Sequence, residues 1–262
     1  MLTTRDLDGA PTWLDLATPD LAGAESFYAG LFDWTLTSPA PGAGAYGVFR
    51  HDGKAVAGIR PVPPAAASQW TVYFRTRDAD ATARAVRAGG GTVDQEPAHV
   101  SGLGRTALCT DPAGAGFAVL QTGTGPGFGA VDEPGALCWT ELHTRDVPSA
   151  MAFYGAVLGV DSATVPLPDG TGSYLLLTPP GAVHDTSFGG VVPLAAGPSG
   201  TGPHWTPYIE VPDPDATAAR TEHLGGTVRL PPTDLDGIGR LARLTDPYGA
   251  RFAVIHSGAP GG

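Results

Sequence analysis

The sequence predicts an α+β protein made of four β-α-β-β-β units, arranged as two similar halves. Phe27-Tyr28 recurs as Phe153-Tyr154, 126 residues later. The Gly-Gly-Thr-Val segment at 90–93 and the Asp-Pro-x-Gly segment at 111–114 both recur 135 residues later. The two offsets indicate a duplication in which about nine residues were gained between the two sets of motifs. The residues between these motifs then predict the individual elements.

The first unit opens with a strand expected at residues 13–18. Asp20 is a good N-cap, and the apolar residues at 21, 24, 27, 28 and 31 follow it at helical spacing. Three further strands are expected at 34–36, 45–50 and 55–60, because Gly and Pro separate these stretches.

The second unit opens with a strand at 70–75, and a helix follows over 79–88 that ends at the glycines 89–91. Strands are expected at 105–110 and 116–121. Both Asp-Pro-x-Gly segments suit type I turns before a strand. The third and fourth units repeat this order from Leu137 and from Trp205.

The repeats divide the chain into a first domain over 9–122, a linker over 123–135 and a second domain over 136–257. Residues 123–135 are the best candidate for a linker because they lie between the two halves and are rich in Gly and Pro. Residues 61–68 and 194–203 are expected to join the two units within each half.

The composition excludes several classes of partner. The net charge is −11, which makes nucleic acid and anionic membranes poor partners. No apolar run is long enough to span a bilayer, and residues 1–8 lack a signal-peptide pattern. Cys109 and Cys138 lie in strand-like runs and are expected to be buried thiols of a cytoplasmic protein.

The ordered motifs resemble those of the vicinal-oxygen-chelate superfamily, which includes glyoxalase I, extradiol dioxygenases and fosfomycin- and bleomycin-resistance proteins. The resemblance rests on the Asp-capped helix with Phe-Tyr, the Gly-Gly-Thr-Val turn and the Asp-Pro-x-Gly strand. It covers residues 11–256 and is strongest to tandem glyoxalase-like proteins of actinobacteria. It implies two domains, each a cup-shaped half-barrel sheet around a cavity, but it does not specify a reaction.

The residues at the metal-ligand positions of that superfamily depart from its pattern. Counting from the helix-capping aspartates places Trp13 and Trp139 where a His ligand is expected, and counting from the Asp-Pro-x-Gly turns places Ala118 and Ala253 at the carboxylate position. Thr71 and Thr206 occupy the remaining positions. Indole, methyl and hydroxyl groups are not ligands for Zn²⁺, Fe²⁺ or Ni²⁺. We therefore expect neither a metal nor any other cofactor.

Side chains alternate along a strand, so every second residue of each unit's first strand faces one cavity. In the first half this face carries the candidate ligand-binding residues Trp13, Asp15, Tyr73 and Arg75. In the second half the candidate catalytic residues are Glu141, His143, His204 and Glu210, and the candidate ligand-binding residues are Trp139, Tyr174, Thr206 and Tyr208. We expect Glu141 with His143, or with His204, to form an acid–base pair.

Other interpretations of these residues remain open. The tryptophans could simply pack in the core, and Asp15 could pair structurally, for example with Arg75. Two His and two Glu of the second half could instead meet in a relocated metal site.

Three functions follow. The first is a metal-independent enzyme that transforms a hydrophobic or aromatic small molecule, of secondary-metabolite type, by isomerase, cyclase or lyase chemistry. The second is a protein that only sequesters such a ligand, as drug-resistance members do. The third is a metal-dependent lyase or dioxygenase. We expect the second half to hold the working site, and a monomer or homodimer whose partner is a small molecule.

Overall fold

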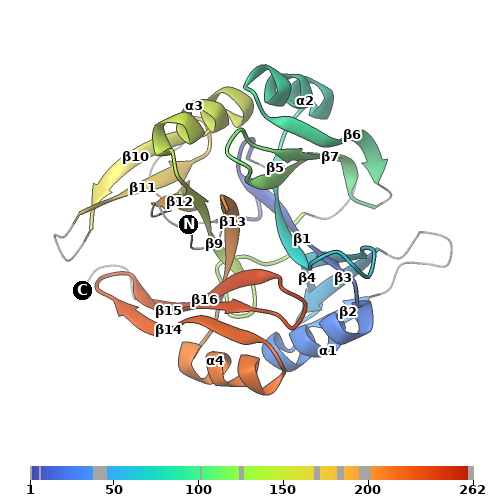
Figure 1. Cartoon of the computed structure of the whole chain (residues 1–262), viewed down its shortest axis with the longest axis vertical. Helices are drawn as coiled ribbons and strands as arrows, with labels where there is room; N and C mark the ends of the chain where they lie inside the picture. Colours follow the sequence, from blue (N-terminus) through green and yellow to red (C-terminus); the bar gives the residue numbers. More distant parts are fainter. Residues whose placement is uncertain are drawn as a thin grey trace.

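The computed structural model describes residues 2–5, 7–37, 46–100, 102–123, 127–167, 172–181, 186–194 and 202–258. Two eight-stranded mixed sheets are flanked by helices, which confirms the predicted α+β class and the four-unit organisation (Figure 1). The helices are α1 (Leu21–Phe32), α2 (Ala79–Ala88), α3 (Val147–Leu158) and α4 (Pro214–His223).

Each sheet is built from one half of the chain. The first sheet has the order β2-β3-β4-β1-β5-β8-β7-β6 and the second β10-β11-β12-β9-β13-β16-β15-β14. The strands of the first sheet are β1 (Pro11–Thr18), β2 (Thr35–Thr37), β3 (Gly47–His51), β4 (Lys54–Pro61), β5 (Gln69–Arg75), β6 (Thr92–Val100), β7 (Gly104–Thr110) and β8 (Gly116–Thr122). Those of the second are β9 (Leu137–Thr144), β10 (Asp161–Pro166), β11 (Ser173–Thr178), β12 (Gly189–Pro193), β13 (His204–Glu210), β14 (Thr227–Leu235), β15 (Gly239–Thr245) and β16 (Arg251–Ser257).

The opening strands of two successive units lie side by side at the centre of each sheet. β1 pairs antiparallel with β5, and β9 pairs antiparallel with β13. These four strands are flanked by the parallel partners β4, β8, β12 and β16. The residues predicted to face a cavity therefore come together from two units in each half.

All four helices begin at an aspartate whose side chain accepts a backbone hydrogen bond from the first helical turn. The bonded amides are those of Gly23, Ala81, Ser149 and Ala216, at 2.9–3.0 Å. This is the interaction for which Asp is favoured at an N-cap, so the helix starts predicted from Asp20 and its counterparts are correct.

The strands β6 and β14 are absent from the elements predicted above. Each lies at the edge of its sheet, is largely exposed and contains proline, as in Thr-Val-Asp-Gln-Glu-Pro-Ala-His-Val. An edge strand can carry proline and charge because one row of its amides faces solvent. Their polar pattern therefore resembles a loop although they pair regularly with β7 and β15.

Reciprocal hydrogen bonds join the halves. Tyr28 of α1 donates to Asp246 Oδ2 at 3.2 Å, and Tyr154 of α3 donates to Asp111 Oδ2 at 3.1 Å. Accordingly α1 lies beside α4, and α2 beside α3 (Figure 1). One large hydrophobic core runs through both halves, and the repeated Phe-Tyr and Asp-Pro-x-Gly motifs form the contact between them.

None of the helices in the described ranges combines the length and apolar character needed to cross a membrane. Both cysteines are buried and free.

Candidate functional site

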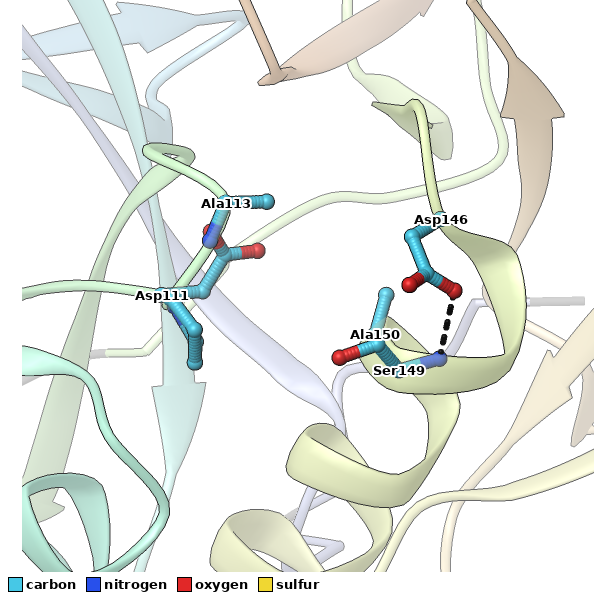
Figure 2. A pocket seen from close by; sticks show the side chains of 6 residues that line it. Asp111, Ala113, Asp146, Ser149 and Ala150 are labelled. Atoms are coloured by element: carbon cyan, nitrogen blue, oxygen red, sulfur yellow. Dashed lines mark hydrogen bonds between the residues drawn. The ribbon is translucent and has the colours of Figure 1, made fainter.

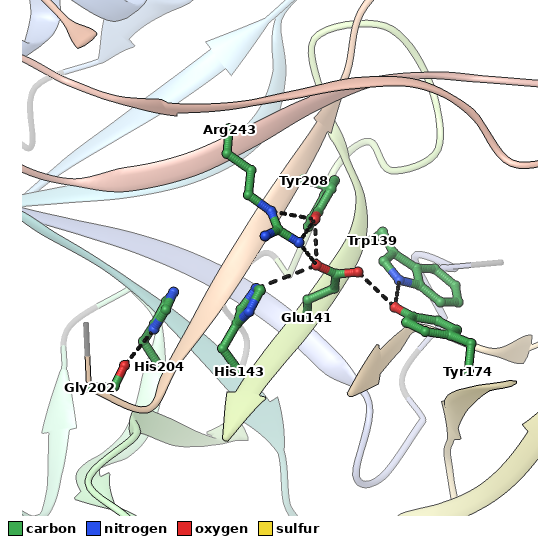
Figure 3. A network of polar contacts seen from close by, with 8 residues as sticks. All are labelled: Trp139, Glu141, His143, Tyr174, Gly202, His204, Tyr208 and Arg243. Atoms are coloured by element: carbon green, nitrogen blue, oxygen red, sulfur yellow. Dashed lines mark hydrogen bonds and ion pairs between the residues drawn. The ribbon is translucent and has the colours of Figure 1, made fainter. Parts of the chain in front are cut away.

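Glu141, in the middle of β9, is the centre of a buried polar network (Figure 3). Its Oε1 accepts a hydrogen bond from Tyr174 Oη at 2.9 Å, and Tyr174 Oη accepts one from Trp139 Nε1 at 3.1 Å. Its Oε2 accepts a short hydrogen bond from Tyr208 and lies 3.0 Å from Arg243 Nη2. Side chains from three other strands, β11, β13 and β15, thus bind one carboxylate of β9.

His143 and His204 extend this network along β9 and β13, where they lie opposite each other in register. Their rings are stacked, with centroids 4.7 Å apart and planes at 7°. His143 Nε2 lies 3.4 Å from Glu141 Oε2, outside hydrogen-bond geometry, and has no other hydrogen-bond partner in the described part of the chain. His204 Nδ1 lies 2.8 Å from the carbonyl oxygen of Gly202.

The network favours the ionised form of Glu141. Burial acts to raise its pKa, but His143, the Tyr208 hydroxyl and the Arg243 charge together hold the pKa below its ordinary value. His204 behaves differently, because burial lowers its pKa to about 4, with positive neighbours adding to the effect. His204 is therefore neutral at pH 7, whereas Glu141 is charged.

The first half contains a corresponding but altered network around Asp15. Trp13 Nε1 donates to Tyr46 Oη at 2.8 Å, as Trp139 does to Tyr174. Asp15 is fully buried and lies 2.8 Å from Arg60 Nε. Burial raises the pKa of Asp15 despite Arg60, in the opposite direction to that of Glu141.

The suggested pairing of Asp15 with Arg75 is not the one that the structure shows. Arg75 Nε lies 3.2 Å from Asp8 Oδ1, and its Nη1 donates to Thr122 at 2.7 Å. Arg60 takes the expected role because β4 lies beside β1, on the opposite side from β5. That neighbour is set by the sheet order, which single-sequence reasoning left open.

A glycine opposite each carboxylate makes room for the tyrosine. Gly58 faces Asp15 across β1 and β4, and Gly190 faces Glu141 across β9 and β12. A Cβ on Gly58 would lie 2.0 Å from Tyr46 Oη, and one on Gly190 would lie 2.2 Å from the Tyr174 ring. Any other residue would displace the phenol from the carboxylate.

Three groups distinguish the second network from the first. At the positions of His143 and His204 the first half has Ala17 and Gln69, which pair with each other in the same way. Arg243 on β15 corresponds to Leu108 on β7, 135 residues earlier. The second half therefore has two imidazoles and an arginine of β15 near its carboxylate, and the first half has none of the three at the corresponding positions.

The remaining predicted residues lie at or beside these networks. Thr206 is buried and directly opposite Glu141, and Tyr73 is buried beside Asp15. Glu210 lies at the end of β13, where it accepts from Ser257 N at 3.0 Å and Ser257 Oγ at 2.7 Å. These contacts place Glu210 with β16 and not with the Glu141 network.

Sequence reasoning missed Arg243, Arg60 and the two glycines. Arg243 lies in β15, whose sequence is Gly-Arg-Leu-Ala-Arg-Leu-Thr. Nothing in that sequence indicates which of its two arginines contacts the site. Gly190 carries a usable signal, because it lies within a strand-like run, where glycine often marks a close approach of another group.

The donor set at the metal positions of this fold does not fit a metal. Trp139, Thr206 and Ala253 stand there in the second half, and Trp13, Thr71 and Ala118 in the first. Within the described ranges no three His, Cys, Asp or Glu side chains lie close enough together to hold an ion.

A separate pocket of about 200 Å³ lies between the Asp-Pro-Ala-Gly turn and the start of α3 (Figure 2). Its lining residues are Asp111, Pro112, Ala113, Asp146, Ser149 and Ala150. In the other half Tyr248 stands at the position of Ala113, and its hydroxyl donates to Asp20 Oδ2 at 3.0 Å. The pocket is therefore the space that a tyrosine fills in the counterpart, and none of its lining residues belongs to the Glu141 network.

Comparison with known proteins agrees with this fold. Residues 11–119 match the Glyoxalase/Bleomycin resistance protein/Dioxygenase superfamily. The chain is 42% identical to the anthracycline biosynthesis protein DauV of Streptomyces sp. (strain C5), over 96% of this chain and 94% of that protein. It is 41% identical to the anthracycline biosynthesis protein DnrV of Streptomyces peucetius, over the same shares.

Among solved structures, the 2,3-dioxygenase LapB from Pseudomonas sp. KL28 superimposes with a TM-score of 0.64. It is 17% identical, and the match covers 97% of this chain and 93% of LapB, so it bears on the fold alone. The repeated units, the two sheets and the full-length relatives lead to one conclusion. This chain belongs to the glyoxalase/bleomycin-resistance/dioxygenase superfamily, also called the vicinal-oxygen-chelate superfamily.

Proposed function

We propose that this protein binds a hydrophobic aromatic small molecule of secondary-metabolite type in its second half and transforms it without a metal. The reaction would be an acid–base isomerisation, cyclisation or lyase step. The observation that carries the proposal is the Glu141–His143 pair, which the first half lacks. The similarity to two anthracycline biosynthesis proteins over nearly the whole chain supports the substrate class.

The pair divides the chemical work between its members. Glu141 is fully engaged by Tyr174, Tyr208 and Arg243 and has a lowered pKa, so its role is to hold a negative charge. His143 lies beside this fixed negative charge, with Nε2 3.4 Å from Glu141 Oε2, and would be the general base that takes a proton from the ligand. His204 is held neutral and stacks on His143, which orients that ring.

Arg243 supplies the positive charge that favours proton removal from a carbon conjugated with a carbonyl. Its side chain is 36% exposed, more than the other charged groups of the network. When a proton leaves such a carbon, negative charge develops on the carbonyl oxygen, and a guanidinium stabilises it. Glu141, His143 and Arg243 thus form a charge-balanced set for enolisation.

Anthrone is a suitable test substrate, because it is a tricyclic ketone with acidic methylene hydrogens. We expect the protein to accelerate deuterium incorporation from D₂O at that methylene, followed by NMR. His143→Asn and Glu141→Gln should each lower the rate by about 100-fold or more, the usual contribution of a general base. Glu210→Gln, whose partners lie on β16, should retain the rate.

One observation favours the sequestering alternative. Both oxygens of Glu141 already accept hydrogen bonds, which also suits a purely structural carboxylate under a binding surface. Saturable anthrone binding with no acceleration of exchange in any variant would favour sequestration over catalysis.

A further inference from the structure

The first half has its own aromatic ring covering Trp13. Phe128, from the connection between the halves, lies with its ring centroid 5.8 Å from that of Trp13, at an interplanar angle of 34°. Backbone hydrogen bonds hold this segment on the first sheet, from Phe128 N to Thr12 O at 3.3 Å and from Gly129 N to Ala55 O at 2.7 Å. Trp13 is consequently 0% exposed.

Trp139 is the counterpart of Trp13 in position and in its hydrogen bond to a tyrosine, but it is only half-buried. Within the described ranges, no ring lies against Trp139 as Phe128 lies against Trp13; its aromatic neighbours are Tyr174, whose hydroxyl accepts from Trp139 Nε1, and Tyr208 of an adjoining cluster. The segments of this half outside those ranges contain no Phe, Tyr or Trp. The same tryptophan is therefore fully buried in one half and partly exposed in the other.

Trp139 lies between a small apolar cluster and the polar Glu141 network, in which Arg243 carries a partly exposed positive charge. Trp139 packs against a small hydrophobic cluster, separate from the main core, made of Cys138, Tyr208, Leu241, Ala253 and Ile255. The partly exposed guanidinium of Arg243 contacts Tyr208 Oη at 3.4 Å. A flat aromatic ring with an acidic or anionic oxygen matches this combination.

We infer that the ligand places an aromatic ring against Trp139, as Phe128 lies against Trp13, with an acidic oxygen directed to Arg243. This deepens the proposed function and rests on it. The inference also fixes the stoichiometry at one ligand per chain, because Phe128 fills the corresponding place in the first half. Phe128 thus occupies, in the first half, the position that we assign to the ligand's ring in the second half.

Anthraquinone-2-sulfonate is a soluble probe that combines a planar ring system with an anionic group. By titration calorimetry we expect one site per chain. Trp139→Leu should weaken binding about tenfold or more, and Trp139→Phe should stay within a few-fold of the wild type, because it keeps a flat ring. Phe128→Ala is the matched control on the other half and should leave the affinity of the first binding event unchanged.

Circular dichroism and the melting temperature would show that each variant is folded. Unchanged affinity in Trp139→Leu, lost affinity in Phe128→Ala, or no saturable binding to the wild type would each overturn the inference. Normal binding in Trp139→Leu together with lost anthrone exchange in Glu141→Gln would overturn only the ring position. Weakened binding in Trp139→Leu with no exchange by the wild type would instead overturn only the acid–base function.

Discussion

Asp15 and Glu141 occupy the same register in the two halves, yet their surroundings shift their pKa values in opposite directions. Asp15 is wholly buried, and desolvation outweighs Arg60, so its pKa is raised. Around Glu141, desolvation is outweighed by His143, Tyr208 and Arg243, and the pKa is lowered. Divergent environments for paired carboxylates are typical of sites in which one has kept or gained a chemical role.

This divergence predicts opposite pH effects on stability for Asp15→Asn and Glu141→Gln. Glu141 has a folded pKa below its unfolded value, so its ionised carboxylate stabilises the folded protein at neutral pH. This stabilisation is lost as the pH falls below the carboxyl range, near about 4. Asp15 has a raised folded pKa, so its ionisation costs stability at neutral pH, and this cost is relieved as pH falls. Urea denaturation at pH 7, 5, 4 and about 3 would measure both.

As pH falls, the stability deficit of Glu141→Gln relative to wild type should shrink, and that of Asp15→Asn should grow. Differences that change in the same direction for both variants would contradict the assigned pKa shifts.

His204 predicts a separate acid sensitivity. Its folded pKa of about 4 lies below the usual 6.5, so the unfolded chain binds more protons between these values. Stability should therefore fall as pH drops from about 6.5 to about 4. His204→Gln should lose part of this dependence in thermal melts recorded across that range. The exposed His99→Gln serves as the control and should follow the wild type.

Substitution of Gly190, which faces Glu141, is expected to change activity. Substitution of its counterpart Gly58, which faces Asp15, is not. Gly190→Ala would drive a Cβ into the Tyr174 ring, and Gly58→Ala would drive one into Tyr46 Oη. Each should cost about 1–3 kcal/mol of stability, as overpacking does. Only Gly190→Ala should also reduce anthrone exchange. Equal effects of both variants on exchange would argue against a working site in the second half.

The pocket beside Ala113 predicts a stabilising pair of substitutions. Tyr248 fills the equivalent space, and a Cβ on the matching Gly23 would lie 1.6 Å from its hydroxyl. Ala113→Tyr alone should therefore clash with Ser149, the counterpart of Gly23. The double change Ala113→Tyr with Ser149→Gly should be more stable than Ala113→Tyr alone, and by about 0.5–2 kcal/mol more stable than wild type, as cavity filling usually is.

A double-mutant cycle of unfolding free energies would measure that coupling. Additive effects of the two substitutions would show that the tyrosine does not enter the pocket as Tyr248 enters its own.

The contact between the halves predicts a loss of about 1–3 kcal/mol in Tyr28→Phe, because the change removes the buried hydrogen bond to Asp246 and also the acceptor of Trp70 Nε1, which donates to the same hydroxyl at 3.0 Å. Tyr154→Phe, at the related contact with Asp111, should have a similar effect. Calorimetric melting would measure both. A much larger loss in one than the other would show that the two contacts are not energetically equivalent.

Local chemistry was enough to determine the repeated units of this protein. The aspartate caps, the apolar spacing of the helices and the alternation that puts Trp139, Glu141 and His143 on one face depend on neighbours in sequence, so their pattern is present in the chain itself. The resemblance of these motifs to a superfamily, together with the non-ligand residues at its metal positions, was readable in the same way.

Tertiary structure alone decided which groups meet. Arg243 reaches Glu141 because β15 and β9 belong to one twisted sheet although two strands separate them, and Arg60 reaches Asp15 because β4 lies beside β1. Phe128 covers Trp13 because the connection between the halves folds back on the first sheet. Such contacts join residues that are distant in sequence, and their energy depends on burial and sheet order, which no local pattern encodes.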